Sequence, residues 1–393
     1  MNMKSKLSDL FKKIAIIFLL LCTAYYVLLV IGYVIPSTLI EENWMESVHV
    51  INGLEEKRWV VMTGFEGTRL DTFTDNLIFQ KLRNLDDLSP FKAAMWNSGY
   101  TRYWMGTVPL IRAGLVFMSY STMRYLNMFV IFTLFAFVFS YIHKQLGIFH
   151  ALSLSISLLL IHFWIFPLSF QYSPVFIILM ITILILLYLN KQNKTSLFNV
   201  ILLFFAVGSV TNYFDLLTAP LLTFGLPYIV YYVIVNQEKI QAFKNNFLSF
   251  VGIGISWLTG YVLTWAANWT VSSIVLNENV FANAFNQVSV RTGGGDLMSI
   301  PNILSRIFSI ALPRPAYLIL LIILFIWIFS FIKNHRNMSD LVNTTPILFT
   351  ILLPIAWIVI MRNHSQIHDY FVYRNLAITI YGTLSWSILS LKE

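Results

Sequence analysis

Two carboxylates four residues apart are the first groups in this sequence whose spacing suggests chemistry. Asp71 and Asp75 lie in the stretch Leu70-Asp71-Thr72-Phe73-Thr74-Asp75, and a helical turn would place both on one face. Such a pair can divide the work of a general base and a metal ligand, provided that their surroundings separate their pKa values. The pattern also fits a capped helix, with Asp71 or Thr72 as the N-cap.

Arginine and aromatic residues come together in the stretch Tyr100-Thr101-Arg102-Tyr103-Trp104-Met105-Gly106, and Arg112 follows it. A guanidinium can hold a phosphate through two parallel hydrogen bonds, and an aromatic ring can stack on the face of a sugar. Arg102 and Arg112 are therefore candidate phosphate ligands, and Tyr103 and Trp104 are candidate sugar-stacking residues. An ordinary aromatic belt at a membrane interface, with arginines that extend toward water, would have the same composition.

Tyr213 and Asp215 lie where two apolar runs meet with almost no connection between them. A carboxylate so close to hydrocarbon is costly and is by default a candidate for function. Pro220 follows soon after, as in a broken helix that faces a cavity. In the alternative interpretation, Asp215 caps the next helix at the surface.

The densest polar cluster lies between residues 362 and 375, where two further apolar runs meet. Its candidate substrate-binding residues are Arg362, His364, His368, Asp369, Tyr373 and Arg374. The two histidines have the spacing of helical metal ligands, but no Glu lies between them and no third ligand is evident, so we predict no metal site there. Arg374 stands at the start of an apolar run and needs a partner, which we expect to be Asp369 or a lipid phosphate.

The elements that must position these residues are membrane spans. Hydrophobic residues make up 58% of the chain and charged residues only 11%. At about 20 residues per crossing, the apolar runs predict an all-α fold, a polytopic membrane helical bundle of about ten transmembrane helices. The predicted spans cover residues 14–35, 121–142, 148–166, 174–190, 197–213, 216–235, 247–268, 315–333, 343–361 and 371–390.

The basic residues predict how this bundle is oriented. Eleven of the fourteen lysines fall in short segments on one face, and eleven of the twelve arginines fall on the opposite face. Lysine-rich short loops mark the cytoplasmic side, so both termini are predicted to be cytoplasmic. The arginine-rich outer face suggests a site for an anionic head group. Lysines beside anionic lipid account for part of the net charge of +8, so we predict no nucleic-acid partner.

Two long segments are predicted on the outer face, residues 36–120 and 269–314. In the first, the apolar stretches 76–82 and 108–118 are too short to cross a bilayer and fit interfacial helices. In the second, the glycine-rich stretch 291–296 predicts a plain loop or a mobile lid. The sequence contains no clear internal repeat or soluble domain, so residues 1–393 are predicted to form a single membrane domain.

With this layout, residues 70–75, 100–106, 211–220 and 363–374 resemble the GT-C superfamily of integral-membrane glycosyltransferases. More narrowly, they resemble a group of Gram-positive membrane proteins tied to cell-surface polysaccharide. The resemblance implies transfer of a sugar, at the outer face of a bacterial cell membrane, from a polyprenyl-phosphate-linked donor to a cell-surface glycan or lipid acceptor. It also implies Asp71 or Asp75 as the base, with arginines at the leaving phosphate. Its members share no single cofactor, although some use a divalent cation.

Two other functions remain open from the sequence. A polysaccharide polymerase of the O-antigen or capsule type also uses lipid-linked sugars and outer-face arginines. A lipid-linked sugar flippase or other transporter would need polar groups in the middle of several spans, whereas stretches such as 177–187 and 318–329 contain no charged residue. The charged motifs gather instead at the outer face.

Overall fold

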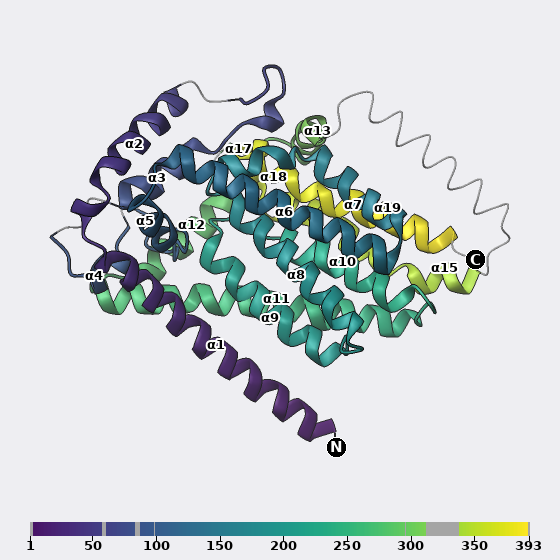
Figure 1. The fold of residues 1–393 in the computed structure, drawn as a ribbon. Helices are drawn as coiled ribbons and strands as arrows, with labels where there is room; N and C mark the ends of the chain where they lie inside the picture. Colours follow the sequence, from purple (N-terminus) through teal and green to yellow (C-terminus); the bar gives the residue numbers. More distant parts are fainter. Residues whose placement is uncertain are drawn as a thin grey trace.

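A computed structural model of the chain describes residues 3–56, 60–82, 87–97, 99–294, 296–311 and 338–391. Within these ranges every regular element is a helix, apart from an isolated bridge between Val60 and Arg69. Figure 1 shows long helices packed side by side, with the helices of residues 41–115 gathered at one end. The predicted all-α class is confirmed for these residues.

Nine of the ten predicted spans coincide with helices, and the remaining one, 315–333, lies outside the described residues. Five of these helices are long and apolar enough to cross a membrane: α1, α6, α8, α9 and α11. The number of crossings and their direction stay predictions. The bounds are α1 Met3–Val34, α6 Tyr120–Leu146, α7 Ile148–Leu160, α8 Ser173–Lys191, α9 Leu197–Phe214, α10 Leu222–Asn236, α11 Phe243–Leu276, α16 Ile347–Ile360 and α19 Leu376–Leu391.

Some helix ends differ from the prediction for local reasons. The apolar run 148–166 is α-helical only to Leu160, because His162 takes a left-handed conformation, and the chain continues in the short 3₁₀ helix η3 (Phe163–Leu168). Helix α11 extends beyond 247–268 at both ends and stops at the left-handed Asn277. Its 34 residues correspond to about 51 Å, more than the roughly 30 Å of a hydrocarbon core.

The two long segments between spans contain short helices. Residues 76–82 and 108–118 are helical over most of their length, as predicted, but α12 continues through Arg291 to Gly293, so half of the predicted glycine-rich loop is helix. Whether these helices lie at a membrane interface stays a prediction. The bounds are η1 Ser37–Leu39, α2 Glu41–Glu56, η2 Glu66–Thr68, α3 Thr72–Lys81, α4 Pro90–Met95, α5 Val108–Leu115, α12 Val280–Gly293 and α13 Ile300–Ala311.

The remaining short helices lie between residues 338 and 375. They are α15 Met338–Thr344, α17 Arg362–Ile367, α18 Asp369–Val372 and η4 Tyr373–Asn375. Helix α17 packs on α12, and α18 packs on α13 and η2, so the turn 362–375 contacts both long segments. In Figure 1 the first residues of α1 and the last residues of α19 lie away from the end that holds α2–α5.

Helices α9 and α11 form the closest packing in the bundle, and glycine makes it possible. The backbone carbonyl of Trp257 lies 2.0 Å from where a Cβ on Gly208 would stand, and that of Phe205 lies 2.1 Å from the same point on Gly260. Only glycine allows such an approach. A hydrogen bond of 2.7 Å between the hydroxyls of Ser209 and Thr264 crosses the same interface.

Candidate functional site

Asp75 is held by four donors, one from α6 and three from the segment before α8. Its carboxylate accepts hydrogen bonds from the Tyr120 hydroxyl at 2.6 Å and from Ser169 Oγ at 3.2 Å. The backbone N–H groups of Phe170 and Gln171 donate to it at 3.3 and 3.2 Å. The side chain is only 1% exposed, and burial raises the pKa of Asp75 to about 7, with a smaller contribution from the charge of Asp71. Asp75 is therefore rigidly positioned at the junction of α3, α6 and the segment before α8.

Asp71 occupies the N-cap of α3, where its carboxylate accepts a hydrogen bond of 3.2 Å from the Thr74 backbone N–H. This confirms the capping interpretation of the Asp71 pattern. Burial raises the pKa of Asp71, and the bonds from Thr74 together with the charges of Arg374 and Arg69 offset part of that rise. With fewer hydrogen bonds than Asp75, it is the freer carboxylate of the two.

Arg374 brings the opposite end of the chain to the same place. Its side chain is 1% exposed, its guanidinium carbon lies 3.8 Å from the centre of the Tyr172 ring, and none of its nitrogens has a hydrogen-bond partner of normal geometry among the described residues. The partner expected from the sequence, Asp369, forms its ion pair with Arg306 of α13 instead. The charge of Arg374 acts on Asp71. Together, Asp71, Asp75 and Arg374 are called the carboxylate–arginine site below.

The residues around this site join the segment before α3 to the turn 362–375. The guanidinium of Arg69 lies 4.3 Å from the centre of the Tyr370 ring, and its backbone carbonyl accepts a hydrogen bond of 3.2 Å from the Tyr172 hydroxyl. The Tyr373 hydroxyl donates to the carbonyl of Gly67 at 2.7 Å. The sequence motif around Asp71 and the turn 362–375, far apart in the chain, therefore share one site.

Asp215 stabilises a tight turn rather than a helix end at the surface. It accepts hydrogen bonds from the backbone N–H groups of Leu217 and Thr218 at 2.9 and 3.0 Å, and Leu217 has a φ of 68°. The side chain is buried, which raises the pKa of Asp215 to about 7. The Gln171 amide donates to Thr218 Oγ1 at 2.6 Å, so this turn is tied to the backbone that holds Asp75.

His364 is fixed in one neutral tautomer. Its Nε2 lies 3.0 Å from the carbonyl of Leu217 and must carry the proton, while Nδ1 accepts from the Arg291 guanidinium at 2.6 Å. Burial lowers the pKa of His364 well below its usual value, and burial also lowers that of His368 to about 4. The described residues contain no cluster of metal ligands.

Several other predicted residues lie in the packing between helices. The Tyr213 ring stacks on Tyr25 with 4.1 Å between centres, and the Trp104 indole N–H donates to the carbonyl of Thr264 at 2.9 Å. Arg362 is half-buried and donates to the carbonyl of Met298. Their contacts with a substrate stay predictions.

Arg112 is buried and joins three elements through its guanidinium. It donates to the backbone carbonyls of Gly32, Ile35 and Leu82, at 2.8 Å and 2.6 Å for the first two. These bonds tie α5 to the end of α1 and to the end of α3. The guanidinium also lines a cavity of about 220 Å³. The phosphate contact predicted for Arg112 is untested, and its present partners are structural.

Replacing Arg112 by alanine should therefore weaken the fold. Three buried carbonyls would lose a charged donor, and a hydrogen bond of this kind contributes about 1.5–3 kcal/mol, so we expect a loss of about 3 kcal/mol or more in the free energy of unfolding. Thermal unfolding of the purified protein in detergent measures the effect, with the exposed Lys92→Ala as control. An unchanged midpoint would contradict the structural function of Arg112.

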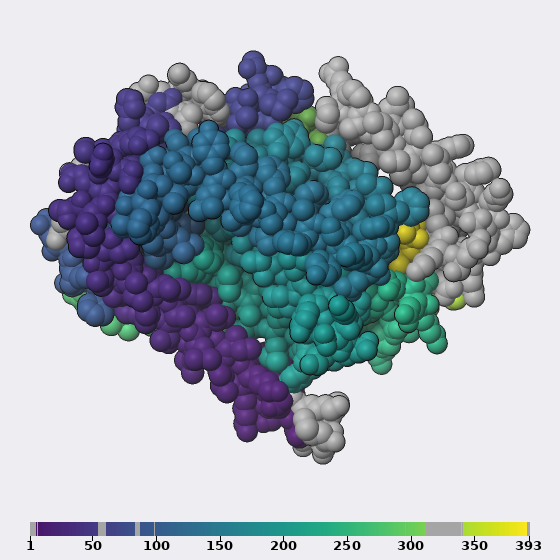
Figure 2. Space-filling view, viewed as in Figure 1, coloured from purple at the N-terminus to yellow at the C-terminus, as the bar shows by residue number. Residues whose placement is uncertain are grey.

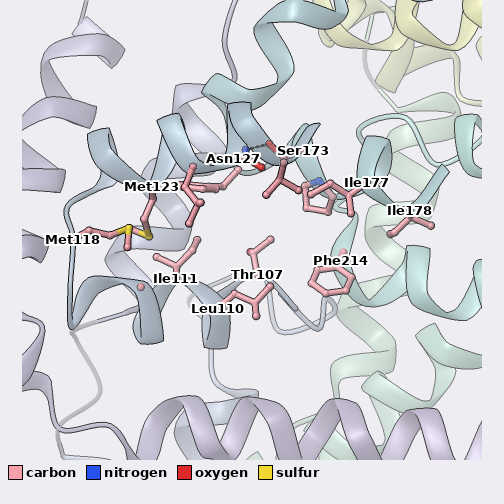
Figure 3. Close-up of a pocket in the computed structure, with 15 residues that line it drawn as sticks. Thr107, Leu110, Ile111, Met118, Met123, Asn127, Ser173, Ile177, Ile178 and Phe214 are labelled. Atoms are coloured by element: carbon pink, nitrogen blue, oxygen red, sulfur yellow. Dashed lines mark hydrogen bonds between the residues drawn. The ribbon is translucent and has the colours of Figure 1, made fainter. Parts of the chain in front are cut away.

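An apolar groove lies next to the carboxylate–arginine site, and we call it the lateral groove. It has a volume of about 350 Å³ and lies between α5, α6, α8 and the end of α9. Figure 3 shows Leu110, Ile111, Met123 and Phe214 around it, and Figure 2 shows a hollow between α1 and α6. Leu110 is 65% exposed, so an apolar side chain stands at the mouth of the groove. Phe170 lines this lateral groove, and its backbone N–H donates to Asp75.

The partners of Asp75 and Arg374 are the part of the site that sequence reasoning missed. Tyr120, Ser169 and Tyr172 stand at the edges of apolar runs, where a hydroxyl gives no signal of what it contacts. The sequence did signal one other group, because Trp257, Tyr261, Trp265 and Trp269 recur every four positions and so share one face of α11.

No protein-family model, curated protein sequence or solved structure matches this chain.

Proposed function

We propose that this protein is a glycosyltransferase of the bacterial cell membrane, which moves a sugar from a polyprenyl-phosphate-linked donor to a cell-surface glycan or lipid acceptor at the outer face. The observation that carries the proposal is the convergence of Asp71 and Arg374 in one buried site. A raised carboxylate pKa beside a buried guanidinium whose nitrogens have no hydrogen-bond partner of normal geometry among the described residues is typical of functional sites. The lateral groove beside them supports a lipid-linked substrate.

The proposed reaction assigns a different task to each residue. The acceptor hydroxyl attacks the anomeric carbon of the donor sugar, and Asp71 takes the proton from that hydroxyl. The bond between the anomeric carbon and the phosphate oxygen breaks, and its electron pair stays on the phosphate, where Arg374 stabilises the negative charge. Asp75, fixed by Tyr120 and the backbone before α8, holds α3 in position.

Access to the site requires a change at its edge. Asp71 is 4% exposed and lies near Arg69 and Tyr370, whose side chains contact each other. The proposal therefore requires that this contact opens when a donor binds, as lids do in many enzymes. The polyprenyl chain would lie in the lateral groove, so that the head group arrives beside Phe170.

The proposal is tested by sugar transfer in proteoliposomes that contain the purified protein, a labelled polyprenyl-phosphate-linked sugar and a lipid acceptor extract. A buried carboxylate acts as a base only when it is ionised, and burial raises the pKa values of Asp71 and Asp75, the latter to about 7. Because Asp71 is the proposed base, we expect the rate to rise with pH and to level off above the usual pH range for a carboxylate. Label that crosses the bilayer without transfer to any acceptor would contradict the proposal and indicate a transporter.

The same assay separates a transferase from a polymerase. A transferase adds one sugar or one fixed unit to the acceptor, whereas a polymerase gives products whose length grows with time. A ladder of products in the purified system would replace the proposed function by polymerisation.

A further inference from the structure

A second apolar space lies between α11 and α12, and we call it the α11 cavity. It has a volume of about 200 Å³. Helix α12 lines it with Ala284 and Val288, among others. Side chains four positions apart share one face of a helix, and on α11 they form a line of aromatic rings along the cavity, Trp257, Tyr261, Trp265 and Trp269. The centres of successive rings in this aromatic line lie 5.3, 5.6 and 5.5 Å apart.

The lining of the α11 cavity suits a hydrocarbon and not an ion. Two arginines border the cavity, but both direct their guanidinium groups to other partners. Arg102 donates to the carbonyl of Gly99 at 2.6 Å and to Asn283 at 3.2 Å. Arg291 donates to His364. Among the lining residues, almost no polar atom is exposed to the cavity. A charged group bound there would lose its water without gaining hydrogen bonds, whereas a hydrocarbon chain has none to lose.

The α11 cavity continues onto an exposed apolar face of α11. Leu258 and Val262 belong to the lining and are exposed, and Ile255, about one turn earlier, is exposed as well. Helix α11 is one of the helices that are long and apolar enough to cross a membrane. In a bilayer this face would lie in hydrocarbon, so a lipid chain could enter the cavity from the side without passing through water.

A wall of two chain segments separates the α11 cavity from the lateral groove. In the first segment Tyr103 lines the cavity and Thr107 lines the groove; in the second, Leu217 lines the cavity and Phe214 lines the groove. A backbone hydrogen bond of 2.9 Å from the N–H of Gly106 joins the two segments. The two spaces share no lining residue. Two lipid chains can therefore be bound at the same time, one on each side of the wall.

Both spaces lead to the carboxylate–arginine site. On the side of the lateral groove, the backbone N–H of Phe170 donates to Asp75. On the side of the α11 cavity, the carbonyl of Leu217 lies 3.0 Å from Nε2 of His364, in the turn that supplies Arg374. The α11 cavity and the lateral groove therefore approach one site from two sides, as a reaction between two lipid-borne substrates requires.

We infer that the sugar acceptor is a lipid, and that a hydrocarbon chain of this lipid lies in the α11 cavity while the donor chain lies in the lateral groove. The affinity of the cavity for a hydrocarbon chain follows from its lining, whereas the identification of that lipid as the acceptor rests on the proposed function. The hydroxyl that gives its proton to Asp71 would then arrive from the turn 362–375, whose Tyr370 lies near Asp71.

Photo-crosslinking of the full-length protein in phospholipid nanodiscs tests the inference. The probe is a monohexosyl diacylglycerol with a diazirine at the end of one acyl chain, and mass spectrometry maps the labelled residues. We expect the label on the aromatic line and on Ala284, above the level at Ile274, which is 75% exposed on α11 and reports bulk lipid.

A matched pair of variants on α12 makes this test specific. Val288 lines the cavity and is 41% exposed, so Val288→Trp can fill the cavity without disturbing the packed core. It should reduce labelling of the aromatic line by about tenfold, because the chain loses apolar contacts for several methylene groups. Val290 is 40% exposed and is not among the lining residues, so Val290→Trp should leave labelling unchanged. In the transfer assay, Val288→Trp should raise the apparent KM for the lipid acceptor and leave that for the donor unchanged.

The outcomes distinguish this inference from the proposed function. Equal labelling of Val288→Trp and Val290→Trp, or labelling of the aromatic line no stronger than at Ile274, overturns the inference. Transfer to a water-soluble glycan as fast as to the lipid extract rejects a lipid acceptor and leaves the proposed function intact. Specific labelling that Val288→Trp removes, without any sugar transfer by the wild type, contradicts the proposed function and leaves the α11 cavity as a lipid-binding site.

Discussion

Asp71→Asn abolishes sugar transfer while leaving the protein folded: this is the largest effect on activity that we expect. Asparagine is as good an N-cap as aspartate, so the start of α3 keeps its hydrogen bond to the Thr74 N–H. The amide cannot take a proton from an acceptor hydroxyl. Loss of a general base lowers a rate by roughly a hundredfold or more, which the proteoliposome assay measures directly.

The matched control for this variant is Glu66→Gln, which removes an exposed carboxylate from the neighbouring helix η2. Its transfer rate should equal that of the wild type. Thermal unfolding should show Asp71→Asn at least as stable as the wild type, because burial already disfavours the charged form of Asp71. Full transfer activity in Asp71→Asn would exclude Asp71 as the base.

Asp75→Asn should behave differently, and the difference separates a base from a structural carboxylate. Two backbone N–H groups and two hydroxyls point at Asp75. An asparagine there would direct its own N–H₂ donors at some of these groups and leave them unpaired. Asp75→Asn should therefore unfold at a lower temperature than Asp71→Asn.

Hydropathy predicted the helical framework because it depends on composition alone. A run such as 197–213 is apolar over the length of a bilayer, and no tertiary contact is needed to recognise it. The start of α3 could also be predicted, because the hydrogen bond of an N-cap residue is made to a backbone N–H only a few residues away. The ends of α7 and α19 were harder to predict, because a left-handed residue and a series of short turns interrupt apolar runs.

The partners of the charged residues could not be predicted, because most of them carry no mark in the sequence. Two of the groups that hold Asp75 are backbone N–H groups, and Arg112 donates to the backbone carbonyls of Gly32, Ile35 and Leu82. Every residue has such groups, so only the fold decides which ones are near. Asp369 was the expected partner of Arg374, yet α13 brings Arg306 to it instead. The convergence of Asp71 with Arg374 likewise became visible only in three dimensions.

The largest effect on stability is expected from Gly260→Val. A Cβ at Gly260 would lie 2.1 Å from the carbonyl oxygen of Phe205, far inside van der Waals contact, and the obstacle is backbone rather than a flexible side chain. Helices α9 and α11 would have to separate, which would also strain the hydrogen bond between Ser209 and Thr264. Overpacking costs about 1–3 kcal/mol where side chains can adjust, so we expect a loss of more than about 3 kcal/mol here.

Gly252→Val is the matched control, since it makes the same substitution on the same helix. The nearest atom to a Cβ at Gly252 is Ile201 Cδ1 at 3.7 Å, which is ordinary contact. Valine also has a higher helix propensity than glycine, so this variant should be as stable as the wild type. Thermal unfolding and the monodisperse yield in detergent compare the two, and equal midpoints would show that α9 and α11 are not in close contact.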